Sequence, residues 1–262
     1  MPDARQIAVS GSERAELEMG TIGPNALEGS RDAAAEFLLT CERMLRRCFL
    51  PPLPEHDLAA SLLSQAADAL LERNLLQAAD LIRRSDLRFL EDYRYKVAGP
   101  LDPAIHRIAK FPVYARSSQT MGRRMPTMAV TREVFARDGY RCRFCGSKVI
   151  VKEARKVFIN ALPTVVRWAG TNRGCHFGLA VLSASIDHVV PFQRGGRSED
   201  LANLVTACNP CQFGRGHCLL DEVELEDPTK YAPVIDDWDG LTRLRAFRLH
   251  RDQSSDAEVS CR

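Results

Sequence analysis

Four of the nine cysteines form two close pairs with the spacing of metal ligands. Cys142 and Cys145 form one Cys-x-x-Cys pair, and Cys208 and Cys211 form the other. Four thiolates suit a tetrahedral zinc ion and leave no position for water or substrate. The 62 intervening residues exceed the usual zinc-ribbon spacing, so the fold has to bring the pairs together. We expect a structural zinc site here rather than four unrelated buried cysteines, and any catalytic metal elsewhere.

A longer pattern of polar and small residues surrounds the second pair. It runs Asp187-His188, Pro191, Gly195-Gly196, Asn203-Leu204 and then Cys208 to Cys211, while Gly139-Tyr140 precedes the first pair. The pattern resembles that of HNH nucleases, which reads Asp-His, Pro, Gly-Gly, Asn-Leu, Cys-x-x-Cys. The resemblance covers roughly residues 128–240, under half of the chain. The alternative interpretation of Asp187 and His188 is that they are two exposed polar residues at the end of an ordinary strand.

The resemblance implies a ββα-metal fold and a role for each polar residue. His188 would act as the general base that takes a proton from the attacking water, a task suited to imidazole. Asp187 would bind Mg²⁺ or Mn²⁺, which prefer carboxylate, amide and water oxygens. Asn203 would brace the loop that directs His188. The implied activity is metal-dependent hydrolysis of phosphodiester bonds in nucleic acid, for which we expect duplex DNA.

One position departs from the family pattern. The residue after the second cysteine pair is usually His or Asn, and here it is Gln212. Gln retains an amide oxygen as a metal ligand, but its extra methylene displaces that oxygen, and a misplacement of about 1 Å can cost roughly 100-fold in rate. His217 is five residues further on, which in a continuous helix is the wrong face for sharing an ion with Gln212.

Positive charge is concentrated in the middle of the chain, although the net charge is only +2. Between Pro103 and Phe158 there are 13 Lys or Arg residues and three acidic residues. Clustered cations of this kind gain affinity for a phosphate backbone by releasing condensed counterions, whereas the alternative is a solvated basic linker. The arginines expected to contact nucleic acid are Arg123, Arg124, Arg141, Arg143, Arg194, Arg197 and Arg215.

Helical patterns surround these motifs. Apolar spacing predicts helices over about 30–49, from about 57 and from about 75, and a short helix from Thr131 that Gly139 ends. The predicted fold class is therefore α+β, a small helical bundle followed by a zinc-stabilised ββα module. The expected domains are a leader at 1–29, a helical bundle at 30–100, a basic linker at 101–127, the nuclease domain at 128–243 with an insert at 147–184, and a tail at 244–262.

Composition narrows the compartment and the possible partners. No apolar run approaches the roughly 20 residues that cross a bilayer, and the first thirty residues lack the apolar core of a secretory signal. We therefore expect a cytoplasmic protein without a membrane partner, with the cysteines reduced. The N-terminal helices are candidates for binding a second copy or another protein. Two further functions stay open: a nucleic-acid-binding module with a degenerate HNH site, and a zinc-stabilised interaction scaffold.

Overall fold

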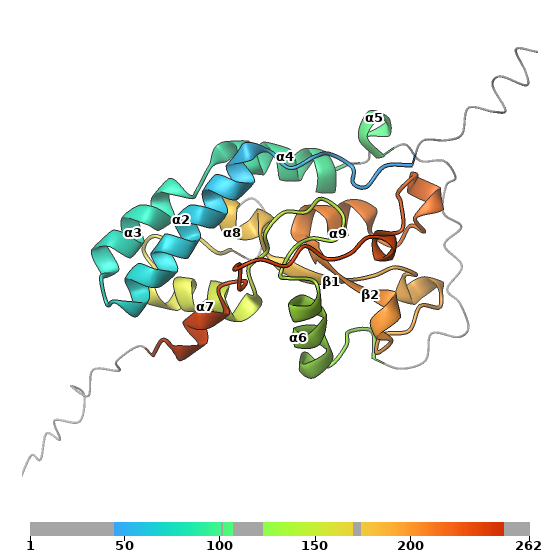
Figure 1. The fold of residues 1–262 in the computed structure, drawn as a ribbon. Helices are drawn as coiled ribbons and strands as arrows, with labels where there is room; N and C mark the ends of the chain where they lie inside the picture. The colour runs from blue at the N-terminus through green and yellow to red at the C-terminus, as the bar shows by residue number, and fades with distance from the viewer. Residues whose placement is uncertain (1–44, 101, 107–122, 170–173, 249–262) are drawn as a thin grey trace, which may run out of the picture. The chain divides into compact units, whose positions relative to one another are not determined.

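A two-stranded antiparallel sheet and one short helix form the part of the fold that carries the sequence motifs (Figure 1). The computed structural model describes residues 45–100, 102–106, 123–169 and 174–248. Strand β1 spans Ala184–His188 and pairs with β2, Leu204–Cys208, so that His188 lies opposite Leu204. Helix α9, Asn209–Arg215, follows β2 directly. The ββα order expected from the resemblance is therefore present within an α+β fold.

Three helices precede this module in the chain. Helix α2 spans Pro54–Leu71, α3 spans Leu75–Arg84 and α4 spans Arg88–Ala98. Proline suits the first turn of α2 because its missing N–H would have no helical partner there. Asn74 caps α3 by accepting a hydrogen bond from the Gln77 N–H at 3.1 Å. The short helix α5, Pro103–His106, comes next.

The predicted insert and the approach to the first cysteine pair are also helical. Helix α6 spans Met128–Arg137, and Gly139 follows it with φ of +62°, a conformation that suits glycine. Helix α7, Lys152–Ala161, and α8, Phe177–Val181, lie within the insert. Five 3₁₀ turns complete the described secondary structure: η3 (Phe192–Arg194), η4 (Leu201–Asn203), η5 (Asp221–Val223), η6 (Pro228–Lys230) and η7 (Thr242–Ala246).

The N-terminal helices and the ββα module share hydrophobic cores. One cluster joins apolar residues of α2 and α3 to Phe158 of α7, Leu179 of α8 and Ile186 of β1. A second cluster joins Tyr93 and Val97 of α4 to the cysteine pairs and to β2. Helix α4 consequently packs on α9, where a side chain at Gly214 would come within 2.4 Å of the Val97 carbonyl oxygen. The domain boundaries drawn from the sequence stay predictions.

The helix predicted over residues 30–49 extends further along the chain than the structure shows. The expected helix over 30–49 lies outside the described residues as far as residue 44, and residues 45–49 form bends and a bridge rather than a helix. Arg46 there forms a bridge with Leu225, and Phe49 is buried beside α4 and α9. Residues 45–49 therefore form a non-helical segment that packs against α4 and α9 before the chain reaches Pro51. None of the helices in the described ranges is long and apolar enough to cross a membrane.

Candidate active site and cysteine cluster

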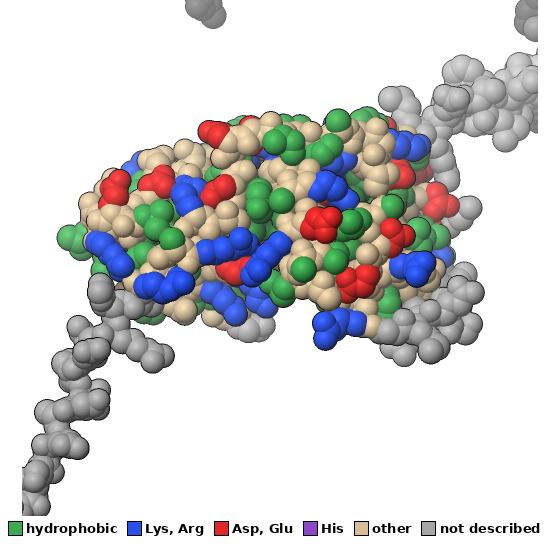
Figure 2. All heavy atoms as spheres, turned by 60° about the horizontal axis from the view of Figure 1, so that its bottom comes forward, with side chains coloured by type: hydrophobic (Ala, Val, Ile, Leu, Met, Phe, Trp, Pro, Cys, Tyr) green, Lys and Arg blue, Asp and Glu red, His purple; other side chains and the backbone are tan. Residues whose placement is uncertain are grey.

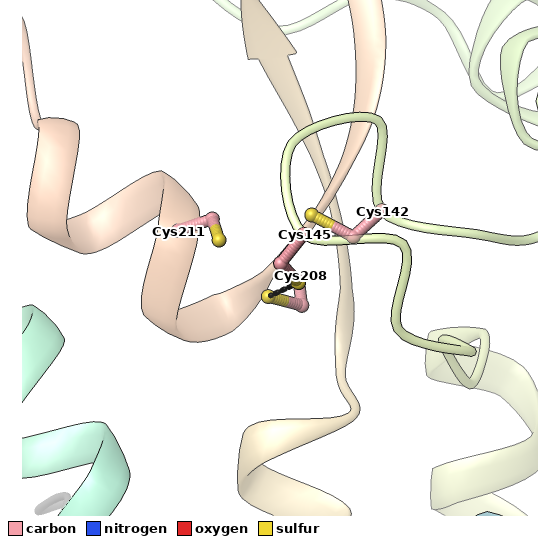
Figure 3. Close-up of side chains that lie close together, drawn as sticks. All are labelled: Cys142, Cys145, Cys208 and Cys211. Atoms are coloured by element: carbon pink, nitrogen blue, oxygen red, sulfur yellow. Dashed lines mark hydrogen bonds between the residues drawn. The ribbon is translucent and has the colours of Figure 1, made fainter. Parts of the chain in front are cut away.

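The two cysteine pairs come together as the spacing predicted. Cys142 and Cys145 lie on a loop after α6, Cys208 ends β2 and Cys211 is in the first turn of α9 (Figure 3). The four Sγ atoms all lie within 4.8 Å of one another, and those of Cys145 and Cys208 are 3.7 Å apart. A tetrahedral zinc–thiolate site has S–S edges of about 3.8 Å. The cluster therefore fits one metal ion.

Local backbone geometry brings the first pair onto the sheet. The Gly146 N–H donates to the Cys142 carbonyl at 2.8 Å, and Gly146 has φ of +80°, which closes the turn between the two thiols. The Arg143 N–H donates to the Thr206 carbonyl at 2.8 Å and fastens this turn to β2. The buried carboxylate of Asp138 accepts from the Thr206 N–H at 2.7 Å. The fold thus holds both pairs against the same strand.

Electrostatics in the cluster favour a bound cation. Hydrogen bonds from Cys142 and the other thiols lower the pKa of Cys145, while hydrogen bonds within the cluster and burial raise the pKa of Cys208 and Cys211. Without a cation these shifts favour a thiolate at Cys145 and thiols at Cys208 and Cys211, because buried negative charges repel one another. A divalent cation allows all four to ionise. Among the described residues, no further histidine, cysteine or acidic residue joins this cluster.

A surface pocket lies beside the cluster at the ends of β1 and α9. Asp187, His188 and Gln212 line it, together with His217 and Arg124. The His188 side chain is buried, and its Nε2 atom has no hydrogen-bond partner among the described residues. Burial lowers the pKa of His188, and the nearby Asp187 carboxylate opposes that shift. The pocket is therefore lined by an imidazole nitrogen that no described residue occupies.

The structure corrects the expected position of His217. Helix α9 ends at Arg215, and Gly216 has φ of +59°, so the chain leaves the helix before His217. Because His217 is not on the helix, its expected position on another helical face is wrong. His217 lines the pocket with Gln212.

Asn203 braces the loop that follows His188. Its side-chain oxygen accepts from the Val190 N–H at 2.8 Å, and its Nδ2 donates to the carbonyls of Val190 and Arg197 at 3.1 and 3.2 Å. Gly196 is needed at this contact, because a Cβ atom there would lie 1.7 Å from the Val190 carbonyl oxygen. These contacts hold the loop together and explain the second glycine of the pattern.

Asp187 does not face the pocket freely. Its carboxylate accepts from Arg215 at both oxygens, at 2.6 Å to Oδ1 and 2.9 Å to Oδ2, and Oδ1 also accepts from the His188 N–H. Burial raises the pKa of Asp187, and the positive charge of Arg215 opposes this shift. Oδ2 accepts one hydrogen bond and keeps a lone pair. Carboxylate and amide oxygens are ligands that Mg²⁺ prefers, and Asp187 and Gln212 both line the pocket.

The seven arginines expected to contact nucleic acid separate into three groups: one buried, three in ion pairs and three exposed. Arg215 is only 1% exposed, so its expected phosphate contact is wrong: the fold turns it inward toward Asp187. Three arginines form ion pairs that partly neutralise their charge: Arg141 with Asp236, Arg143 with Asp138, and Arg194 with Glu222. Arg123, Arg124 and Arg197 are exposed. Sequence spacing gave no signal for this division, because burial depends on the packing around each side chain.

Comparison with known proteins agrees with the geometry. The family model of the HNH endonuclease matches residues 173–212, a segment that includes β1, Asn203, the second cysteine pair and Gln212. The first pair, Cys142 and Cys145, precedes the matched segment. No curated protein and no solved structure matches the chain significantly. Residues 173–212 therefore match the HNH endonuclease family, and this match covers less than half of the chain.

Proposed function

We propose that this protein is a metal-dependent endonuclease that hydrolyses phosphodiester bonds in nucleic acid, with duplex DNA as the expected substrate. The observation that carries the proposal is the His188 Nε2 atom, which is buried, lacks a partner among the described residues and lines a pocket with Asp187 and Gln212. A buried nitrogen without a partner is costly unless a ligand or water uses it. In this proposal it accepts the proton of the attacking water.

Each neighbouring residue then has a task within the pocket. Asn203 holds the loop that follows His188 through its two contacts with Val190, which keeps the imidazole directed at the substrate. Asp187 and Gln212 would hold the Mg²⁺ or Mn²⁺ ion, which when bound stabilises negative charge on the phosphate and the leaving oxygen. Zinc is the ion proposed for Cys142, Cys145, Cys208 and Cys211, where it would serve stability alone.

The proposed nucleic-acid contacts begin at the rim of the pocket. Arg124 lines the pocket and is exposed together with its neighbour Arg123. Further basic side chains lie where α7 contacts η7. Figure 2 shows Lys and Arg side chains gathered on the left of the face that it draws. Exposed basic residues of this region include Arg132, Lys152, Lys156, Arg245 and Arg248, of which Arg132 and Arg245 also pair with Glu153. A phosphate backbone is the partner that such a surface suits.

The proposal is tested by plasmid cleavage with Mg²⁺, with Mn²⁺ and with chelator. His188→Ala should lower the cleavage rate by about 10²–10⁴-fold, the usual contribution of a general base. DNA affinity should stay near that of the wild type, since His188 provides no phosphate contact. Metal-independent cleavage, or full activity of His188→Ala, would refute the assigned roles.

A second candidate function is a nucleic-acid-binding module with a degenerate site. Gln212 favours it, because the longer side chain displaces the amide oxygen from the family's usual position. The pairing of Arg215 with Asp187 favours it too, because it neutralises the carboxylate that would bind the cation. Tight DNA binding without cleavage of any DNA or RNA, by wild type and by Gln212→Asn, would support this function in place of the nuclease.

A further inference from the structure

Arg215 is a fully buried arginine at the end of α9, and every one of its donors is used. Guanidinium has five N–H groups in a fixed plane. Nε and Nη2 donate to the two Asp187 oxygens, Nη2 donates also to the His188 carbonyl, and Nη1 donates to the carbonyls of Val189 and Cys218 at 3.3 and 2.8 Å. Five donors thus meet five acceptors.

The acceptors belong to the segment that carries the proposed base. Three consecutive residues at the end of β1, namely Asp187, His188 and Val189, contact Arg215 through a carboxylate or a carbonyl. The Cys218 carbonyl ties the same guanidinium to the chain beyond α9, and the guanidinium carbon lies 5.9 Å from the centre of the Phe144 ring. Phe144 lies between the cysteines of the first pair. Arg215 therefore connects the end of β1, the cysteine loop and the end of α9.

We propose that Arg215 is a positioning residue: it fixes the Asp187 carboxylate and the backbone of His188, so that the imidazole is held toward the pocket and one Asp187 lone pair is left for a cation. The inference deepens the proposed nuclease function and rests on it for the role of His188. Lysine cannot replace Arg215 here, because its three donors radiate from a single nitrogen and cannot reach the five acceptors. Only 1% of the side chain is exposed, which leaves little surface for a phosphate contact.

The test compares Arg215→Lys with Arg143→Lys in the full-length protein. Arg143 is a matched control, because its guanidinium is also largely buried and pairs with the buried Asp138, but it does not line the pocket. Histidine-selective NMR reports on His188, whose ring signals are assigned by their absence in His188→Ala. Arg215→Lys should shift or broaden these signals, and Arg143→Lys should leave them unchanged even if it lowers the melting temperature.

Kinetics and binding separate positioning from substrate contact. Arg215→Lys should lower kcat by about 100-fold, the cost of a misplacement near 1 Å, while KM changes by less than about threefold. Affinity for a DNA duplex without added Mg²⁺, and its salt dependence, should match the wild type. Unchanged His188 signals in a folded Arg215→Lys would overturn the proposal, and a weaker affinity with a flatter salt slope would show instead that Arg215 contacts phosphate.

A second variant covers the case in which Arg215→Lys does not fold. Asp187→Asn combined with Arg215→Met removes both buried charges, a change that a core often tolerates when volume is kept. Its His188 signals are compared with those of Asp187→Asn alone, and a further change between the two supports positioning by Arg215. Identical His188 signals in these two variants contradict it. If wild type cuts no nucleic acid, the nuclease proposal fails, whereas the NMR comparison still decides whether Arg215 orders the end of β1.

Discussion

Two neighbouring sites of this protein use adjacent residues of one helix in opposite ways. Cys211 in α9 directs its sulfur into the buried cluster, and the next residue, Gln212, lines the open pocket. Within the cluster each thiol has other thiols as partners. In the pocket, the Nε2 atom of His188 has no partner among the described residues. A site whose groups satisfy one another serves stability, whereas an unsatisfied buried group invites a ligand.

The two sites also differ in what depends on them. The pocket is built from the end of β1 and the end of α9, and both the loop of the first cysteine pair and α9 are anchored at the cluster. None of the four cysteines of the cluster, in contrast, lines the pocket. Loss of the cluster should therefore disrupt the pocket, while changes within the pocket should leave the cluster intact.

The largest expected effect tests this one-way dependence. Cys211→Ser should remove the bound zinc and the cooperative melt of residues 123–248, because the binding free energy of a structural zinc contributes directly to folding. Elemental analysis and calorimetry measure both. Cys175→Ser is the control, since Cys175 is buried outside the cluster and should keep one zinc per chain. An unchanged melt of Cys211→Ser would contradict the four-thiolate site.

A smaller effect, confined to the pocket, is expected at Gln212. Asn restores the shorter amide of the family pattern, so Gln212→Asn should keep or raise the cleavage rate, by up to about 100-fold if the displacement is near 1 Å. Gln212→Ala should lower the rate and raise the Mg²⁺ concentration needed for half-maximal activity. Both variants should retain zinc and the wild-type melting temperature. Loss of zinc in either one would show that the two sites are not separable.

A still smaller effect is expected at the rim of the pocket. Replacing both Arg123 and Arg124 with Gln should weaken binding of unrelated duplexes to a similar extent and reduce the slope of log affinity against log salt by about 2. Arg83 and Arg84 are a second adjacent, exposed pair on α3, and their replacement by Gln should preserve the slope. A changed preference at one base pair would indicate direct reading of bases rather than phosphate contact.

The smallest effect is a loss of folding stability at acidic pH. It is measured apart from cleavage activity, which can also change with pH at the pocket. His176 caps α8 by accepting from the Leu179 N–H at 3.2 Å, and its Nε2 lies 2.9 Å from the Ile82 carbonyl, which requires the neutral ring. Burial lowers the pKa of His176 below its ordinary value of 6.5. The unfolded chain therefore takes up protons first, and stability should decline as the pH falls below about 6.5 and level off below the folded pKa.

His176→Asn isolates this contribution, because asparagine caps a helix without titrating. Its free energy of unfolding should fall less between pH 7.5 and pH 5.5 than that of the wild type, because no group at this position then titrates. Denaturant unfolding at several pH values measures the difference. His56, whose pKa burial also lowers, should account for part of the decline that remains. Equal pH dependence in the variant and the wild type would exclude His176 as a source of acid sensitivity.

The sequence by itself determined the elements that carry the motifs. Cysteine spacing predicted the cluster, the resemblance to HNH nucleases implied the ββα order, and Gly139 predicted the end of α6. These features are local: a thiolate pair within one turn, or a glycine at positive φ, needs few distant contacts to be specified. The departure at Gln212 was likewise visible in the sequence.

The tertiary structure alone decided which polar residues face inward. Arg215 and Arg124 are indistinguishable as charges in the sequence, yet one is buried against Asp187 and the other lines the pocket. His217 joins the pocket because α9 stops two residues earlier, and α4 covers the cysteine region because Tyr93 and Val97 pack there. These outcomes depend on where a short helix ends and on what packs beside it. Both are set by contacts between residues far apart in the chain, which local spacing does not encode.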